Sequence, residues 1–258
     1  MTPLLEVNNI SKSFGGIKAL TNVSLNINQG EILGLIGPNG SGKTTLFNII
    51  TGFYQCDNGK VLFKGKDITG QSPHIIAQKG VVQTFQHLAL WSNFSVFNNV
   101  RIALLMKSGL NIFGSLLNTT SYRRMKKKIA EEVMEILQFV GMEQRRDQLA
   151  DTLSHGYQRT LSLAIGLAKR SPLLLLDEPV TALNPERVKH IMSLLNRLRE
   201  QGSSILIIEH NMRAIFKTCD RIVVLNTGNN LAEGTPPEIR ENKDVIAAYL
   251  GGVSDAEY

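Results

Sequence analysis

The chain has 258 residues, of which 43% are hydrophobic and 6% aromatic, and it carries a formal net charge of +6. This composition is typical of a globular protein with one good-sized core, and it excludes a disordered chain. The longest apolar runs, such as Leu161–Ala168, fall far short of the roughly 20 residues that span a bilayer as a helix. Because Met1–Glu6 lacks the basic-then-apolar pattern of a secretory signal, we expect a cytosolic protein. Cys56 and Cys219 have no metal-ligand spacing and are expected to be free, at least partly buried thiols.

The N-terminal stretch predicts short strands joined by tight turns. The strand-like segments are Leu4–Ile10, Val23–Ile27 and Val61–Lys64, and the turns are Phe14-Gly15-Gly16 and Asp57-Asn58-Gly59. This pattern indicates a small antiparallel layer beside a larger sheet.

Four further runs are apolar, three of them with β-branched residues, and none alternates strictly, which is typical of strands buried on both faces of a parallel sheet covered by helices. They are Ile32–Ile36, Leu173–Leu176, Ile205–Ile208 and Ile222–Leu225. The sequence therefore predicts an α/β fold with a parallel-sheet core.

A glycine-rich loop separates the first of these runs from a helical segment, Thr44–Ile50. It fits the pattern G-x-x-x-x-G-K-[ST], in which glycines let backbone N–H groups converge on a phosphate at a helix N-terminus. Lys43 would reach the β- and γ-phosphates, and the Thr44 hydroxyl would ligate Mg²⁺. A glycine-rich turn without a ligand is the alternative, and the flanking strand and helix argue against it. We therefore predict a site for ATP and Mg²⁺ that consists of Gly37, Pro38, Asn39, Gly40, Ser41, Gly42, Lys43, Thr44 and Thr45.

Residues 87–160 carry mostly helical signals and predict a helical subdomain inserted into the α/β core. A helix that ends at Gly141 is indicated by an apolar face made of Ile129, Val133, Ile136, Leu137 and Val140. The basic run Arg123–Lys128 precedes that face. A solvated helix face is its first interpretation, and contact with an anionic membrane surface or with nucleic acid are the alternatives.

Two carboxylates, Asp177 and Glu178, follow the apolar run Leu173–Leu176. Ligands of open α/β sheets bind at the carboxyl ends of strands, although a simple polar turn would be an equal alternative without the phosphate loop. Asp177 would hold Mg²⁺ through water, and Glu178 would orient and deprotonate an attacking water.

Helix starts are predicted at two places in the C-terminal half. Asn184 is a candidate N-cap with Pro185 in the first turn, and that helix would continue to about Gln201. Thr235-Pro236-Pro237-Glu238 has the pattern of a capping box.

The segment Leu153–Arg159, which reads LSHGYQR, resembles the ABC family signature LSGGQQR and precedes the acidic strand as in that family. Ser154 and Gly156 match the pattern, whereas His155 and Tyr157 depart from it. From about residue 4 to 251 the chain resembles an ABC transporter ATP-binding subunit. The resemblance implies a P-loop NTPase (RecA-like) fold in a single ABC ATPase domain over residues 1–258.

The resemblance also implies roles for single residues. Gln86 is similar to the Q-loop glutamine that touches Mg²⁺ and the attacking water, and His210 to the switch histidine at the γ-phosphate. Ala182-Leu183-Asn184 resembles the D-loop, and Phe14 stands where the family places an aromatic that stacks on adenine. Taken singly, these residues would be a surface glutamine, a strand-end histidine and a core phenylalanine.

Because the chain carries one phosphate loop and one signature segment, the resemblance implies that it is one of two subunits that together form a working ATPase. In the family, the signature of one subunit closes on nucleotide held by another, so Ser154 and Gly156 would serve the Lys43 of a second ATPase subunit. Hydrolysis by Glu178, with His210 and Gln86, would be coupled through the helical lobe to integral membrane permease subunits at the cytoplasmic face of a bacterial inner membrane. A periplasmic substrate-binding protein would take part indirectly, and no nucleic acid is expected.

Three features resemble the ATPases of branched-chain amino acid importers: the insertion around Lys107–Lys128, the D-loop Leu183-Asn184-Pro185 and the tail Ala248–Gly251. The ATPase of a lipid or lipopolysaccharide exporter is the alternative within transporters. A soluble ABC ATPase of DNA repair or translation is disfavoured by the single ATPase unit and by the absence of sustained heptads. A binding module without hydrolysis is disfavoured by the presence of both Glu178 and His210.

Overall fold

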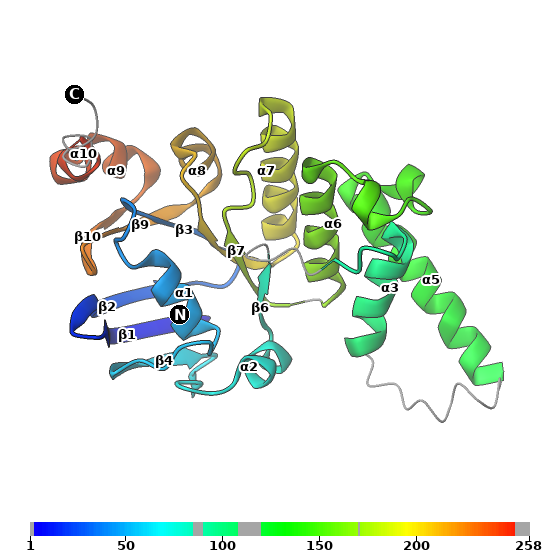
Figure 1. The fold of residues 1–258 in the computed structure, drawn as a ribbon, viewed down its shortest axis with the longest axis horizontal. Coiled ribbons are helices and arrows are strands. Elements are labelled where there is room, and N and C mark those ends of the chain that lie inside the picture. Colours follow the sequence, from blue (N-terminus) through cyan, green and yellow to red (C-terminus); the bar gives the residue numbers. More distant parts are fainter. Residues whose placement is uncertain (1–2, 85–89, 108–119, 170, 251–258) are drawn as a thin grey trace. The chain divides into compact units, whose positions relative to one another are not determined.

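The computed structural model describes residues 3–84, 90–107, 120–169 and 171–250 (Figure 1). Gln86 and residues 108–119 of the predicted insertion lie outside the described residues. Within the described ranges, no helix combines the length and the hydropathy that a membrane crossing requires.

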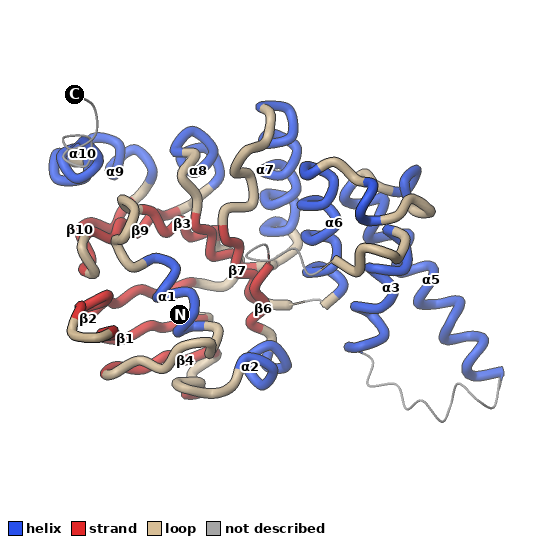
Figure 2. The backbone as a smooth tube through the Cα atoms, viewed as in Figure 1, coloured by secondary structure: helices blue, strands red, loops and turns tan. Residues whose placement is uncertain are grey.

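The larger sheet confirms the predicted parallel core. Its strand order is β10-β9-β3-β8-β7-β6 (Figure 2). β3 pairs in parallel with β8 and β9, and β7 in parallel with β8, whereas β10 is antiparallel to β9. Every residue of β3, β7 and β8 is buried, which explains their continuous apolar sequences. The strands are β3 (Ile32–Ile36), β6 (Val81–Thr84), β7 (Leu173–Asp177), β8 (Ser204–Ile208), β9 (Arg221–Asn226) and β10 (Asn229–Gly234).

A second, antiparallel sheet has the strand order β2-β1-β4-β5. Its first hairpin turns through Gly15 and Gly16, both at positive φ, as the turn prediction requires. The predicted turn at Asp57–Gly59 is wrong in part, because β4 already begins at Asn58, which pairs with Ser11. The strands are β1 (Leu5–Phe14), β2 (Ile17–Ile27), β4 (Asn58–Phe63) and β5 (Lys66–Asp67).

The main apolar core lies between the two sheets and includes α1 (Lys43–Ile50). One face of β3 contributes Leu33 and Leu35 to it. On the other face, Gly34 lets α8 (Met212–Thr218) approach closely, since a Cβ there would lie 3.0 Å from the Cys219 sulfur. Cys219 is buried and Cys56 partly buried, and both are free thiols as predicted.

Helix ends in this part of the chain follow the predicted capping. The Asn184 side chain accepts a 2.9 Å hydrogen bond from the Arg187 N–H at the start of α7 (Pro185–Glu200). Thr235 and Glu238 form the reciprocal capping box that begins α9 (Pro236–Glu241). Among the described residues of 1–83 and 172–258, the other two helices are α2 (Pro73–Lys79) and α10 (Lys243–Leu250).

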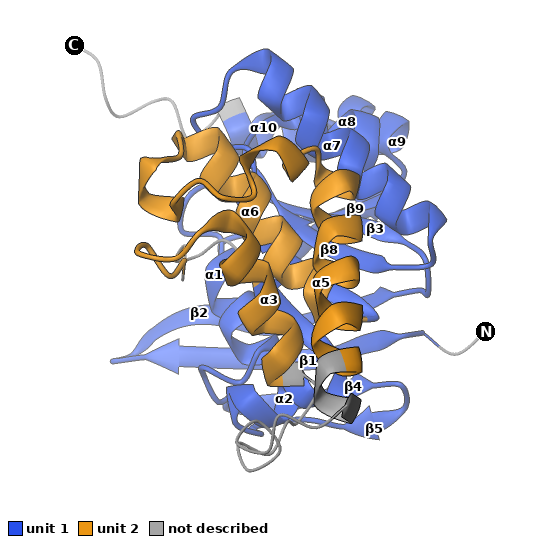
Figure 3. Cartoon of the chain, turned by 90° about the vertical axis from the view of Figure 1, so that its right-hand side faces the viewer, with its two compact units in different colours: residues 1–83, 172–258 blue, residues 84–171 orange. Residues whose placement is uncertain are grey.

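The chain divides into two compact units, one of residues 1–83 and 172–258 and the other of residues 84–171 (Figure 3). Apart from Thr84, which ends β6, and a bridge between Ser95 and Leu149, the described regular structure of the second unit is helical. Its α-helices are α3 (Val96–Lys107), α5 (Thr120–Val140) and α6 (His155–Ala168), and short 3₁₀ turns cover Glu143–Arg145 and Ala150–Thr152.

Helix α5 contains both the predicted apolar face and the basic run that precedes it. Ile129, Val133, Leu137 and Val140 are buried, whereas Ile136 is only partly so. Gly141, at φ 71°, follows the last helical residue. Lys126, Lys127 and Lys128 are exposed, in agreement with a solvated face.

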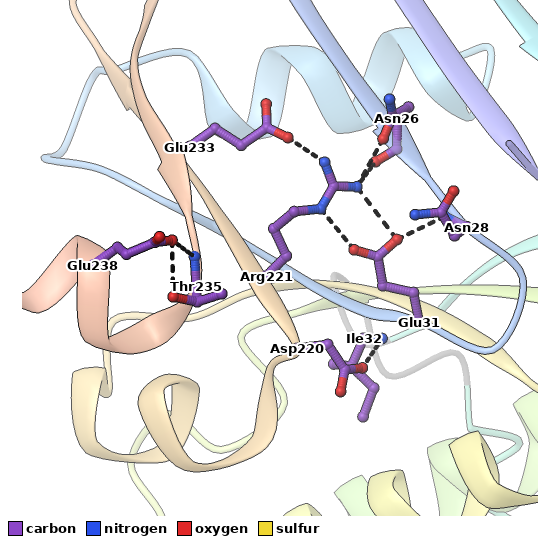
Figure 4. Close-up of polar contacts among 9 residues, drawn as sticks. All are labelled: Asn26, Asn28, Glu31, Ile32, Asp220, Arg221, Glu233, Thr235 and Glu238. Atoms are coloured by element: carbon purple, nitrogen blue, oxygen red, sulfur yellow. Dashed lines mark hydrogen bonds and ion pairs between the residues drawn. The ribbon is translucent and has the colours of Figure 1, made fainter.

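An ion-pair network joins the two sheets at the amino ends of β3 and β9 (Figure 4). The Arg221 guanidinium donates to the Glu31 carboxylate at 2.8 Å, to the Asn26 backbone oxygen at 2.7 Å, and to Glu233 on β10. Glu31 also accepts from the Asn28 N–H at 2.7 Å. The Glu31 side chain is only 9% exposed, so its charge depends on these donors.

We expect Arg221→Met to lower the free energy of unfolding by about 2–4 kcal/mol, because it leaves the Glu31 carboxylate buried without its cation. Urea denaturation of the full chain measures this change. Glu233→Gln serves as the control, and its loss should stay below about 1 kcal/mol since the Glu233 side chain is 42% exposed. Equal losses in the two variants would contradict a central role for the Glu31–Arg221 pair.

Candidate active site

The glycine-rich loop connects β3 to α1, as predicted. Gly37 has φ 151°, and a Cβ there would lie 2.1 Å from the Leu225 oxygen on β9. Gly42 has φ 101°, and a Cβ there would lie 2.7 Å from the Ala19 oxygen. Both positions therefore require glycine for steric reasons as well as for their backbone angles.

Lys43 begins α1, and its ammonium is held inside the loop. It donates to the carbonyl oxygens of Gly37 at 2.8 Å and Pro38 at 2.9 Å, and it lies 3.4 Å from the Ser41 hydroxyl. Burial lowers the pKa of Lys43, while the nearby Glu178 and Asp177 oppose that shift. A charged amine among loop carbonyls is suited to transfer its hydrogen bonds to phosphate oxygens.

The acidic pair lies at the carboxyl end of β7, beside β8. Asp177 is 8% exposed, and burial, reinforced by the Glu178 charge, raises its pKa to about 6. Glu178 has φ 51°, a left-handed conformation that a non-glycine residue adopts only at a cost. Its N–H is anchored by the Ile208 oxygen at 2.9 Å. Backbone strain at this residue fits a functional side chain.

The predicted switch histidine contacts the predicted base. The His210 Nε2 lies 2.8 Å from the Glu178 Oε1, a hydrogen bond in which the ring N–H donates. The Thr181 hydroxyl donates to the other Glu178 oxygen at 3.3 Å. Both Glu178 and His210 remain substantially exposed, at 39% and 43% of their side-chain surface, so both can reach a ligand.

A pocket of about 230 Å³ brings the loop, the acid and the histidine together. Its lining consists of Ala19, Asn39, Gly40, Gly42, Lys43, Thr44, Thr45, Glu178, Ile208 and His210. A Cβ at Gly40 would meet no atom within 4 Å, so this glycine borders open space. The pocket therefore offers backbone donors, a cation and hydroxyls to a phosphate chain.

The donor set suits Mg²⁺ held jointly with phosphate oxygens. Asp177 is a buried carboxylate whose raised pKa shows that its charge lacks full compensation, and Thr44 supplies a hydroxyl in the pocket. No cluster of three or more His, Cys, Asp or Glu side chains that could hold a metal occurs among the described residues. The Asp177 carboxylate and the Thr44 hydroxyl fit a Mg²⁺ ion that is shared with phosphate oxygens and water.

Phe14, predicted to stack on adenine, ends β1 and is 42% exposed. Its ring meets Tyr54 edge-on, with centroids 5.4 Å apart, and the Lys12 ammonium lies 5.3 Å from its centroid. Phe14 is therefore not a core phenylalanine, and an exposed face remains for a base.

The signature segment begins α6 in the helical unit. Ser154 is the N-cap residue and Gly156 is buried in the first turn. Tyr157, which departs from the signature, is held within this unit, because the Arg145 guanidinium lies 4.0 Å from its ring centroid and donates to its hydroxyl at 3.1 Å. Arg145 is thus a structural partner for the tyrosine that stands in place of the signature glutamine.

Two residues at the site were not predicted from the sequence. Glu209, 1% exposed, accepts hydrogen bonds from backbone groups of the loops after β7 and β8. Tyr249 of α10, noted only as part of the tail, lies beside Gly37: burial raises the pKa of its hydroxyl, and the Gly37 backbone N–H opposes that shift. The sequence signal for Glu209 was an acidic residue directly after an apolar strand and next to His210. No sequence signal indicated the position of Tyr249.

Comparison with known proteins agrees with this geometry. The family model described as "ABC transporter" matches residues 20–181, and "Branched-chain amino acid ATP-binding cassette transporter" matches residues 230–255. The ATP-binding cassette MJ1267 in its ADP conformation superposes with a TM-score of 0.84 at 30% identity, covering 97% of this chain and 100% of that chain. The chain therefore belongs to the ABC transporter family, whose ATP-binding domains hydrolyse ATP to power transport.

Curated relatives narrow the family further. The high-affinity branched-chain amino acid transport ATP-binding protein LivG of Escherichia coli is 40% identical over 96% of this chain and 98% of its own length. BraF of Pseudomonas aeruginosa, described in the same words, is 39% identical with the same coverage. The chain belongs to this branched-chain amino acid group of ABC ATP-binding proteins, which confirms the resemblance found in its motifs.

We expect Asp177→Asn to stabilise the chain while abolishing its hydrolysis. An ordinary aspartate pKa of 3.8 rises to about 6 here, and each pKa unit corresponds to about 1.4 kcal/mol against the ionised folded state. Without nucleotide or Mg²⁺ at pH 7.5, the variant should gain up to about 3 kcal/mol in free energy of unfolding.

The gain should shrink as the pH falls from 6 toward 4, because Asp177 then becomes protonated and neutral in the folded wild-type chain. Urea titrations of the variant and the wild-type chain at several pH values measure this difference in the free energy of unfolding. A loss of stability at pH 7.5 would contradict the electrostatic account.

Proposed function

We propose that the chain is the ATP-hydrolysing subunit of a branched-chain amino acid importer. The observation that carries the proposal is the hydrogen-bonded pair of Glu178 and His210 beside the Lys43 loop, in one pocket. Relatives of nearly equal length are named for branched-chain amino acid transport, which supports the substrate class.

In the proposed mechanism, loop N–H groups and Lys43 bind the β- and γ-phosphates of ATP. Glu178 orients a water for in-line attack on the γ-phosphorus and takes its proton, while the bond to the bridging oxygen breaks and ADP leaves. His210 holds Glu178 through its 2.8 Å contact and faces the transferring group. Thr44 and Asp177 would hold Mg²⁺, which neutralises phosphate charge, and Gln86 would take part in the same site.

We also propose that two ATP-binding chains act together, with Ser154 and Gly156 of one completing the site of the other. The ATP-binding cassette MJ0796 bound to ADP and phosphate is a dimer, and it superposes on 90% of this chain with a TM-score of 0.75 at 26% identity. The partner can be a second copy or a related ATPase. The assembly would lie peripherally at the cytoplasmic face of a bacterial inner membrane.

The helical unit is the proposed contact for the permease subunits. Its described surface has an open groove of about 650 Å³ along α5. The groove is lined by apolar, polar and charged side chains, namely Phe97, Lys127, Ala130, Glu131, Met134, Glu135, Gln138, Arg146 and Asp147. Such a mixed lining suits a reversible protein contact.

Glu178→Gln should bind ATP with unchanged affinity. Its rate of hydrolysis should fall at least about 100-fold, because the amide cannot accept the proton of the attacking water. Phosphate release measures turnover, and gel filtration with ATP should reveal a trapped dimer. The control is Glu200→Gln, an exposed acid at the end of α7, which should retain full turnover. Hydrolysis by Glu178→Gln at the wild-type rate would refute the mechanism.

Purification of the tagged chain from its own membranes should recover two different integral membrane subunits and a second ATPase. The expectation follows from the family, since the chain carries one phosphate loop and one signature segment. Mass spectrometry of the detergent-solubilised complex identifies the partners. Recovery of ribosomes or DNA in place of membrane subunits would refute the importer proposal.

A further inference from the structure

Glu209 is a buried acid whose charge the proposed mechanism does not use. It directly follows β8, and only 1% of its surface is exposed. Within the part of the chain that the structure describes, no lysine, arginine or histidine forms an ion pair with it. Burying a carboxylate without a cation is costly, so its hydrogen bonds must compensate.

The carboxylate divides its two oxygens between two loops. One oxygen accepts from the Val180 N–H at 2.6 Å, in the loop after β7. The other accepts from the N–H groups of His210 at 3.0 Å and Asn211 at 3.2 Å, in the loop after β8. The first loop carries Glu178 two residues before Val180, and the second carries His210 itself.

Only a carboxylate can make this link, because an amide side chain has a single acceptor oxygen and its NH₂ group would face backbone donors. The link also falls where the backbone is strained, between Glu178 at φ 51° and Ala182 at φ 62°. Strained turns persist when surrounding contacts hold them, and the Val180 bond is such a contact.

We propose that Glu209 is a positioning residue for ATP hydrolysis: by holding the loops after β7 and β8 at one separation, it maintains the contact between Glu178 and His210. The inference rests on the proposed function, because it concerns the geometry of that same hydrolytic pair. Glu209 is not one of the residues that line the pocket, and it contacts the site only through backbone N–H groups of the two loops.

Glu209→Gln in the full chain tests the proposal. We expect kcat to fall about 10- to 100-fold, since charge-assisted hydrogen bonds to one of the loops are lost. The KM for MgATP and the Kd for MgADP should change less than about 2-fold, because the phosphate loop is untouched. A fall in stability with unchanged kcat would assign Glu209 a structural role only and overturn the proposal.

Glu31→Gln is the matched control. Glu31 is also a buried acid that accepts a backbone N–H, from Asn28 at 2.7 Å, but it lies at the amino end of β3. The Glu31→Gln substitution should lower the free energy of unfolding and leave kcat within about 2-fold of the wild-type value. If Glu31→Gln lowered kcat as much as Glu209→Gln, the effect would reflect general destabilisation, and the proposal would fail.

A double-mutant cycle with His210→Ala separates positioning from independent effects. If Glu209 acts through the Glu178–His210 contact, adding Glu209→Gln to His210→Ala should cost less than about 3-fold in kcat. Multiplicative losses would overturn the proposal.

Glu209→Asp keeps the charge on a shorter side chain and supplies a second variant. Because it cannot span both loops, its kcat should fall at least about 5-fold, and wild-type kcat would refute the link. Failure of the wild-type chain to hydrolyse ATP at all would instead refute the proposed function.

Discussion

Parallel hydrogen bonding of β3, β8 and β7 is the constraint on which the rest of the structure depends. The register places Leu35 opposite Ile208 and Ile208 opposite Asp177. Because the three strands run in the same direction, whatever follows them meets at one edge of the sheet. The phosphate loop, the Glu178 turn and the His210 loop come from distant parts of the sequence, and this register alone brings them together.

The two ends of the sheet treat charge in opposite ways. At the amino end, the buried Glu31 carboxylate is matched by the Arg221 guanidinium and by the Asn28 N–H. At the carboxyl end, burial raises the pKa of Asp177, the charges of Glu178 and Glu209 reinforce that shift, and His210 and Lys43 offset only part of it. One end thus stabilises the fold, while the other keeps uncompensated charge for a cation and a phosphate chain at a cost in stability.

The tail and the signature segment are each held by a contact that lies outside the motif patterns. Tyr249 of α10 lies beside Gly37, so the region matched by the branched-chain amino acid family model approaches the first glycine of the phosphate loop. Tyr157, at a position where the signature pattern has glutamine, is held by Arg145. Each of these segments is therefore held in part by a side chain from outside its own motif.

By itself, the sequence determined the local elements and the chemistry of the motifs. Continuous apolar runs specify the buried strands, Asn184 and Thr235 specify helix starts, and the spacing of Gly37, Gly42 and Lys43 specifies a phosphate loop, since each is a property of neighbouring residues. Strand ends were less certain: β4 begins inside a predicted turn because pairing with β1 outweighs local turn preference. Only the tertiary structure decided that Glu209 bridges two loops and that Tyr249 meets Gly37. These contacts depend on strand register and helix packing across the whole chain, and no local pattern encodes them.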